Sequence, residues 1–196
     1  MGRILVIYGT THGQTGRIAQ AMAETLRRDA LTVDVMDARD ARDASPAGYD
    51  GVIVAASIHA GGYQRRVKQW LRRHHSALTG RRGLFVSVCL GVLEKRLEAQ
   101  RELGRIMRRF LDSCGWEPDM QRHIAGALPY TRYGWLTRRI MRRIVAQAGG
   151  DTDTSRDYEY TDWDEVTRLA RRFGASVQLA DPDRAALMAA PEGAPR

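Results

Sequence analysis

The sequence predicts one α/β domain in which a parallel sheet is covered by helices on both faces. Segments dense in β-branched and aliphatic residues recur along the chain, and a stretch with helical periodicity follows each of them. The chain has 196 residues, of which 43% are hydrophobic and 28% charged, and this suits one domain with a sizeable core. We expect the domain to span residues 1–180, and residues 181–196, rich in Asp, Pro and Ala, to form a disordered tail.

Strands and helices alternate along the predicted domain. Apolar composition predicts strands at residues 3–8, 32–36, 50–56, 83–89 and 122–128. One helix is expected to end at Gly115, which can adopt the left-handed conformation of a helix end, and the last to begin near Asp162, with Glu165 completing a capping box. The helical faces expected in the core are Ile18, Met22 and Leu26; Val67, Trp70, Leu71 and Leu78; Leu103, Ile106, Met107, Phe110 and Leu111; and Val166, Leu169, Ala170, Phe173 and Val177.

Charge and apolar runs limit the classes of protein that this chain can belong to. It has no run of about 18 apolar residues and no cleavable signal pattern, so we expect neither a membrane span nor secretion. Cys89 and Cys114 form no CxxC pair and no metal-ligand spacing, which favours buried reduced thiols in a cytosolic protein and no metal site. The net charge of +8 fits an acidic partner: nucleic acid, an anionic membrane surface or a carboxylate-bearing substrate.

A hydroxyl-rich turn joins the first strand to the first helix. Backbone N–H groups at such a point have no partner within the helix and lie at the positive end of its dipole, so they bind phosphate readily. The turn lacks the lysine of a Walker A loop and the GxGxxG pattern of a dinucleotide site, and it matches the phosphate loop of flavodoxins, which hold FMN. An ordinary turn with a threonine N-cap is the alternative. The predicted phosphate-binding residues are Thr10, Thr11, His12, Gly13, Gln14 and Thr15.

Two further loops should flank the flavin ring, because ligands of open parallel sheets bind outside the carboxyl ends of the strands. Tyr63 can stack on the ring, although its spacing fits core packing of the following helix about equally well. His59 either lies near the flavin or faces water, and it is assigned no proton-transfer role. The residues of these loops are Ser57, Ile58, His59, Ala60, Gly61 and Tyr63 after the third strand, and Ser87, Val88, Cys89, Leu90 and Gly91 after the fourth.

Beyond flavodoxins in general, the chain resembles the flavodoxin-type, quinone-dependent protoporphyrinogen IX dehydrogenases of bacterial haem biosynthesis. The matching pieces occur in order along almost all of the chain, and those from Ile124 to Trp163 are the most particular. They are Gly13-Gln14-Thr15, Ala56-Ser57-Ile58, Ile124-Ala125-Gly126-Ala127-Leu128, Gly149-Gly150 with Thr152-Asp153-Thr154, and Tyr160-Thr161-Asp162-Trp163.

The resemblance implies a fold, a cofactor and a reaction. The fold is a flavodoxin-like open parallel five-stranded sheet in the order 2-1-3-4-5, with a long insert, about residues 129–157, after or within the fifth strand. The implied cofactor is FMN, the electron donor is protoporphyrinogen IX, and the acceptor is menaquinone or ubiquinone at the cytoplasmic face of the inner membrane. Residues 89–96 depart from the family, because this segment is more apolar and less basic at its start, and His12 stands where other residue types are usual.

The insert contains a short basic amphipathic helix pattern with aromatic residues before it. Such a helix can lie in an anionic headgroup layer, and its arginines can also bind the propionates of a porphyrinogen. The alternative is a surface helix with a solvated basic face. Arg65, Arg66, Lys68, Arg72 and Arg73 form a second basic stretch, which we expect to be solvated. The alternative is that it forms one membrane-facing surface together with the insert. The insert arginines are Arg138, Arg139, Arg142 and Arg143.

Two other functions share the predicted cofactor site. One is a general flavodoxin-fold quinone reductase with another donor, and the other is an FMN electron-transfer protein. Typical flavodoxins have an acidic surface, so the charge of +8 argues against the second. A nucleic-acid-binding module would leave the threonine-rich loop without a purpose, so no nucleic-acid partner is expected. No residue is identified as a catalytic acid or base, and a homo-oligomer is left open.

Overall fold

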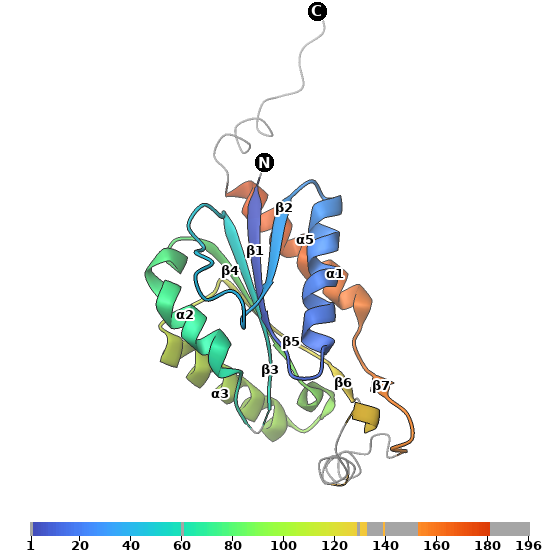
Figure 1. The fold of residues 1–196 in the computed structure, drawn as a ribbon. Helices are drawn as coiled ribbons and strands as arrows, with labels where there is room; N and C mark the ends of the chain where they lie inside the picture. The colour runs from blue at the N-terminus through green and yellow to red at the C-terminus, as the bar shows by residue number, and fades with distance from the viewer. Residues whose placement is uncertain (1, 60, 129, 133–138, 140–152, 181–196) are drawn as a thin grey trace, which may run out of the picture.

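A five-stranded parallel sheet with the order β2-β1-β3-β4-β5 forms the centre of the molecule (Figure 1). It is seen in a computed structural model that describes residues 2–59, 61–128, 130–132, 139 and 153–180. The predicted order 2-1-3-4-5 is therefore confirmed. The strands are β1 (Arg3–Gly9), β2 (Thr32–Asp37), β3 (Gly51–Ser57), β4 (Arg82–Val88) and β5 (Met120–Ile124).

Helices cover both faces of the sheet, two on each (Figure 1). α1 (Gln14–Arg28) and α5 (Trp163–Leu179) pack on one face, while α2 (Arg65–Leu78) and α3 (Leu97–Cys114) pack on the other. Successive strand residues point to opposite faces, so Ile4 and Val6 of β1 join the core under α1, and Leu5 and Ile7 join the core under α2. None of the helices in the described part of the chain is long and apolar enough to cross a membrane.

The predicted helix ends are confirmed. Gly115 ends α3 in the left-handed conformation, with φ of 68°. The Asp162 carboxylate caps α5 by accepting a hydrogen bond of 2.9 Å from the backbone N–H of Glu165. The first four strands lie within one residue of their expected bounds.

The prediction of a fifth strand at residues 122–128 is wrong. β5 ends at Ile124, and the chain continues as β6 (Ala127–Leu128), which pairs antiparallel with β7 (Tyr158–Glu159) in a separate ribbon. Leu128 and Tyr130, both 0% exposed, form a small core of their own with Leu90 and Tyr158. The end of the apolar run therefore belongs to this second core and not to the sheet. The insert accordingly begins after the fifth strand. It begins with a 3-10 turn at Tyr130–Arg132.

Candidate cofactor site

The predicted phosphate loop lies between the carboxyl end of β1 and the first turn of α1. Gly13 is the N-cap of α1, in the left-handed region with φ of 98°, and no side chain caps the helix. The backbone N–H of Gly13 donates to Thr10 Oγ1 at 2.8 Å, which closes the loop. The N–H groups of the first helical turn can therefore receive an anion. A threonine N-cap, the alternative reading of this turn, is not what the structure has.

The loop residues differ in exposure. Thr11 is exposed, while Thr10, His12, Gly13 and Gln14 are half-buried. Thr15 is 1% exposed and, like Gln14, belongs to α1.

Gln64, which the sequence reading missed, connects the phosphate loop to the loop after β3. Its Nε2 donates to Ser57 Oγ at 2.6 Å and to Thr11 Oγ1 at 3.4 Å, and its Oε1 accepts from the backbone N–H of Ser57 at 3.3 Å. Gly9 allows this approach: a Cβ there would lie 2.5 Å from Val67 Cγ2 and 3.0 Å from Gln64 Oε1. No motif identifies Gln64, because it is an ordinary polar residue just before α2.

Backbone hydrogen bonds hold the two expected ring loops together. The N–H of Ile58 donates to the carbonyl of Val88 at 3.0 Å, and the N–H of Cys89 donates to the carbonyl of Ile124 at 3.1 Å. His59 and Gly62 form an antiparallel bridge that closes the loop after β3. These loops and the phosphate loop therefore follow strands that end at the same edge of the sheet (Figure 1). Ala60, also predicted to contact the ring, lies outside the described residues.

The ring of Tyr63 is partly buried and packs against the core beneath this edge. Its centroid is 4.6 Å from that of Phe110 and 5.3 Å from that of Phe85. Its hydroxyl donates to Ser87 Oγ at 2.7 Å, and burial raises the pKa of Tyr63 despite this bond. These contacts match the core-packing alternative, and contact with a flavin stays a prediction.

Two histidines from different loops meet at the same edge. The rings of His12 and His59 lie edge to face with centroids 5.6 Å apart, and His59 Nε2 is 3.1 Å from Ser57 Oγ. Desolvation, and then the proximity of His12, lower the pKa of His59. The neutral form of His59 is therefore favoured at neutral pH.

Two polar groups, one in the ring loop after β4 and one on β5, are desolvated. Cys89 is a free, partly buried thiol, and burial raises its pKa, so the thiol form is favoured. His123 pairs in register with Ser87 on the neighbouring strand, and burial lowers its pKa. Within the described residues, His123 Nδ1 is buried without a hydrogen-bond partner. His123 was not singled out from the sequence.

The base of the insert is bound to the first turn of α1. The Gln14 side chain donates to Glu159 Oε1 at 3.0 Å and to Thr161 Oγ1 at 2.8 Å, while Arg17 donates to Glu159 Oε2 at 2.8 Å. Burial raises the pKa of Glu159, but the bonds from Arg17 and Gln14 outweigh it, so the pKa of this carboxyl is lowered. Gln14, predicted to bind the cofactor, thus uses its side chain to hold Glu159 of β7 and Thr161.

Comparison with known proteins identifies the family. The flavodoxin domain family matches residues 5–155. The chain is 33% identical over 171 residues to the protoporphyrinogen IX dehydrogenase [quinone] of Escherichia coli strain K12, a match that covers 87% of this chain and 94% of that protein. The chain belongs to this flavodoxin-type dehydrogenase family. A second relative of the same name, from Leishmania major, is 32% identical over 184 residues, which cover 93% of this chain and 78% of the relative.

Solved structures agree with the flavodoxin fold of this dehydrogenase family member. Flavodoxin 1 from Bacillus cereus superposes with a TM-score of 0.53 at 16% identity, covering 90% of this chain and 97% of that chain. An apo NADH:FMN oxidoreductase (EMOB) superposes with a TM-score of 0.55 at 17% identity, covering 94% of both. At these identities the likeness supports the fold alone.

The predicted insert arginines are only partly described. Arg139 is helical and exposed. Arg138, Arg142 and Arg143 lie outside the described residues. The second basic stretch, on α2, has the exposed positions that were expected, apart from the half-buried Lys68.

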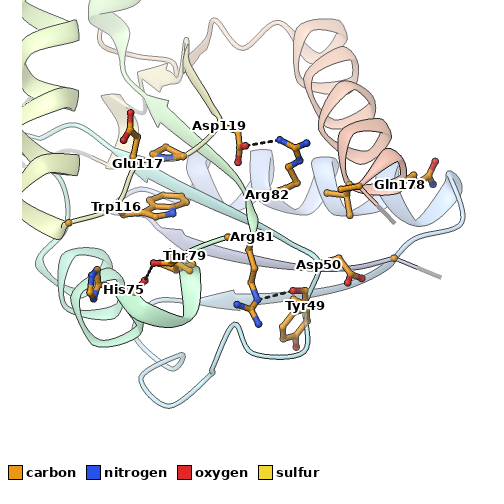
Figure 2. A pocket seen from close by; sticks show the side chains of 17 residues that line it. Tyr49, Asp50, His75, Thr79, Arg81, Arg82, Trp116, Glu117, Asp119 and Gln178 are labelled. Atoms are coloured by element: carbon orange, nitrogen blue, oxygen red, sulfur yellow. Dashed lines mark hydrogen bonds and ion pairs between the residues drawn. The ribbon is translucent and has the colours of Figure 1, made fainter. Parts of the chain in front are cut away.

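One cavity lies away from the cofactor loops of this dehydrogenase family member. It has a volume of about 1250 Å³ and lies at the amino edge of the sheet (Figure 2). There Arg82 pairs with Asp119 at 2.8 Å, and Arg81 donates to the carbonyl of Tyr49 at 3.0 Å. Its borders reach Ala180, the last residue that the structure describes. A smaller cavity of about 460 Å³ adjoins the phosphate loop and is lined by Tyr8, Thr10, Gly13, Gly16, Arg17 and Trp163, among others.

Proposed function

We propose that this protein oxidises protoporphyrinogen IX to protoporphyrin IX in haem biosynthesis, with FMN as cofactor and a membrane quinone as acceptor. The observation that carries the proposal is the 33% identity to the Escherichia coli protoporphyrinogen IX dehydrogenase [quinone] along 94% of that protein. The match extends well beyond a shared phosphate loop.

The residues at the carboxyl edge fit FMN. The uncapped first turn of α1 and the hydroxyls of Thr10 and Thr11 suit its phosphate, and Gly13, in the left-handed region, allows the backbone to come close. Ser57–Tyr63 and Ser87–Gly91 would flank the ring. When bound, FMN supplies the two-electron redox chemistry, and the protein supplies position, exclusion of water and electrostatics.

A membrane location follows from the acceptor. Menaquinone and ubiquinone reside in the bilayer, so we place the protein at the cytoplasmic face of the inner membrane as a peripheral protein. The charge of +8 suits an anionic surface, and the insert arginines, of which Arg139 is exposed, are candidates for contact with lipid or with substrate propionates.

Anaerobic reduction of the FMN-loaded protein by protoporphyrinogen IX tests the reaction. We expect bleaching of the flavin absorbance on mixing and its recovery when a menaquinone analogue is added. Free FMN at the same concentration is the control for reaction without the protein. Bound FMN that stays oxidised would show that protoporphyrinogen IX is not the donor.

The segment after β4 favours one alternative. The segment begins with residues 89–93, none of which is charged, and it follows a strand that ends at the cofactor edge. A general quinone reductase with another donor would keep the FMN site and differ here. Flavin bleaching by NADH without bleaching by protoporphyrinogen IX would support that alternative.

A further inference from the structure

Two exposed leucines lie beside the cofactor loops. Among the described residues, Leu93 (47% exposed), Leu97 (73%) and Leu179 (66%) are the exposed large hydrophobic residues. Leu93 ends a 3-10 turn at Leu90–Leu93, directly after the predicted ring loop, and Leu97 begins α3. Leu179 ends α5 at the opposite edge of the sheet (Figure 1). Leu93 and Leu97 therefore form an apolar pair at the functional edge.

The segment that carries this pair is held in place from both sides. The side chain of Gln100, in α3, donates to the carbonyls of Val92, at 3.1 Å, and Glu94. On the other side, Leu90 packs against the small core of Leu128 and Tyr130 at the base of the insert. The two leucines are thus exposed on a segment that these contacts hold in place.

Charged side chains surround the leucine pair. Lys95, Arg96 and Arg101 are exposed. The acids of the same segment are Glu94, 3.3 Å from Arg96, the exposed Glu98, and Glu102, which pairs with Arg105 and Arg109. For Lys95 and Arg101 the described part of the chain records no ion pair. Arg65 and Arg66, in the first turn of the neighbouring helix α2 at the same edge, are also exposed, and α2 contains no Asp or Glu. The edge therefore combines apolar side chains with an excess of positive charge.

We propose that Leu93 and Leu97, together with Lys95, Arg96 and Arg101, form a surface that docks on an anionic lipid bilayer. Apolar side chains flanked by cations suit the headgroup boundary, where the leucines leave water and the cations meet anionic lipid. Two leucine side chains are far too small an area for a stable dimer, which buries about 800 Å² per partner. The inference rests on the proposed function in one respect: docking here holds the cofactor loops against the layer that contains the quinone.

Sedimentation with vesicles of phosphatidylcholine and phosphatidylglycerol tests the surface with the full chain loaded with FMN. We expect the Leu93→Ser/Leu97→Ser variant to lower the partition coefficient at least about tenfold, because most of the buried apolar area is lost. Leu179→Ser, an equally exposed leucine at the far edge, is the matched control and should bind as the unmodified protein does. FMN content and melting temperature verify that each variant is folded.

Charge is tested separately. Lys95→Gln/Arg101→Gln should weaken binding to anionic vesicles several-fold and leave the weak binding to pure phosphatidylcholine unchanged, since lipid attraction acts on each cation near the surface. Equal partition of the leucine variant and the unmodified protein would overturn the proposal. So would loss of binding only when Arg138, Arg139, Arg142 and Arg143 are replaced, which would assign docking to the insert.

The outcomes also separate this surface from the proposed reaction. Leucine-dependent vesicle binding without reduction of FMN by protoporphyrinogen IX would leave the surface standing and reject the reaction. Reduction of FMN by protoporphyrinogen IX with leucine-independent vesicle binding would support the reaction and reject the surface. A change of oligomeric state in the leucine variant, with vesicle binding unchanged, would make the pair a contact between copies and would also overturn the proposal.

Discussion

Replacing Gly9 by alanine tests how closely the cofactor edge is packed. A Cβ at this position would lie 2.5 Å from Val67 Cγ2 and 3.0 Å from Gln64 Oε1, so the start of α2 must move. Gly9 is the last residue of β1 and has no positive φ, so the effect is steric. Overpacking of this kind costs about 1–3 kcal/mol. For a domain of this size, that lowers the melting temperature by roughly 2–12 °C.

The same substitution should weaken FMN binding. Movement of Gln64 disturbs the hydrogen bonds that connect Ser57 to Thr11, each worth about 1 kcal/mol, so we expect affinity to fall about five- to tenfold. Thermal denaturation followed by circular dichroism gives the stability, and quenching of FMN fluorescence gives the affinity. Gly104→Ala is the control, because nothing lies within 4 Å of its Cβ position in α3 and alanine is the better helix former by about 0.5–1 kcal/mol.

A second variant distinguishes the clash from other effects. Val67→Ala removes the nearest methyl group, so Gly9→Ala should cost less in that background than in the unmodified protein, a coupling that a double-mutant cycle measures. The reasoning would be refuted if Gly9→Ala melted and bound FMN as the unmodified protein does. Equal costs in both backgrounds would also refute it, because the strain would then not lie at Val67.

Three further predictions concern the insert, pH and the thiols. Glu159→Gln should weaken the attachment of the insert base to Arg17 by about 0.2–1 kcal/mol, seen as a slightly lower melting temperature, and Glu117→Gln, an exposed acid in the loop between α3 and β5, is the control. Lowering the pH from 7.5 to 5.5 should reduce the free energy of unfolding measured in urea. Burial lowers the pKa values of His59 and His123 in the folded protein, so the unfolded chain takes up protons at a higher pH than the folded protein does. The stability that the two histidines contribute is complete above their unfolded pKa and is lost as the pH falls from that value towards the folded pKa. An unchanged stability would contradict this. Cys114 should react slowly with iodoacetamide at pH 7.5 in the native protein and quickly in urea, because burial raises its pKa; fast native alkylation would contradict the burial.

The attachment of the insert has a consequence for the site. Gln14 is the first residue of α1, whose backbone end is expected to hold phosphate, and its side chain holds Glu159 and Thr161 at the base of the insert. A bound phosphate and the insert therefore share one helical turn. We expect a shift of the insert base to move the phosphate site, and a shift of the phosphate site to move the insert base, because both involve the first turn of α1.

Much of the fold was predictable because its signals are local. Apolar runs identified the first four strands to within one residue, and Gly115 and Asp162 identified two helix ends. The position of the phosphate loop followed from a hydroxyl-rich turn between a strand and a helix. The predicted end of the fifth strand was wrong because the apolar run continues past Ile124 to Leu128, which belongs to a second core. An apolar run in the sequence does not indicate which core its residues join.

The sequence by itself determined the α/β alternation, the loops at the carboxyl edge and the family, because these depend on neighbouring residues, hydrophobic period and motifs in order. Only the tertiary structure decided which side chains meet. Gln14 and Glu159 lie 145 positions apart, Gln64 and Thr11 lie 53 apart, and the ring of Tyr63 packs against those of Phe85 and Phe110. Such contacts arise when the parallel strands bring their carboxyl ends to one edge, and no local pattern records which distant groups then face each other.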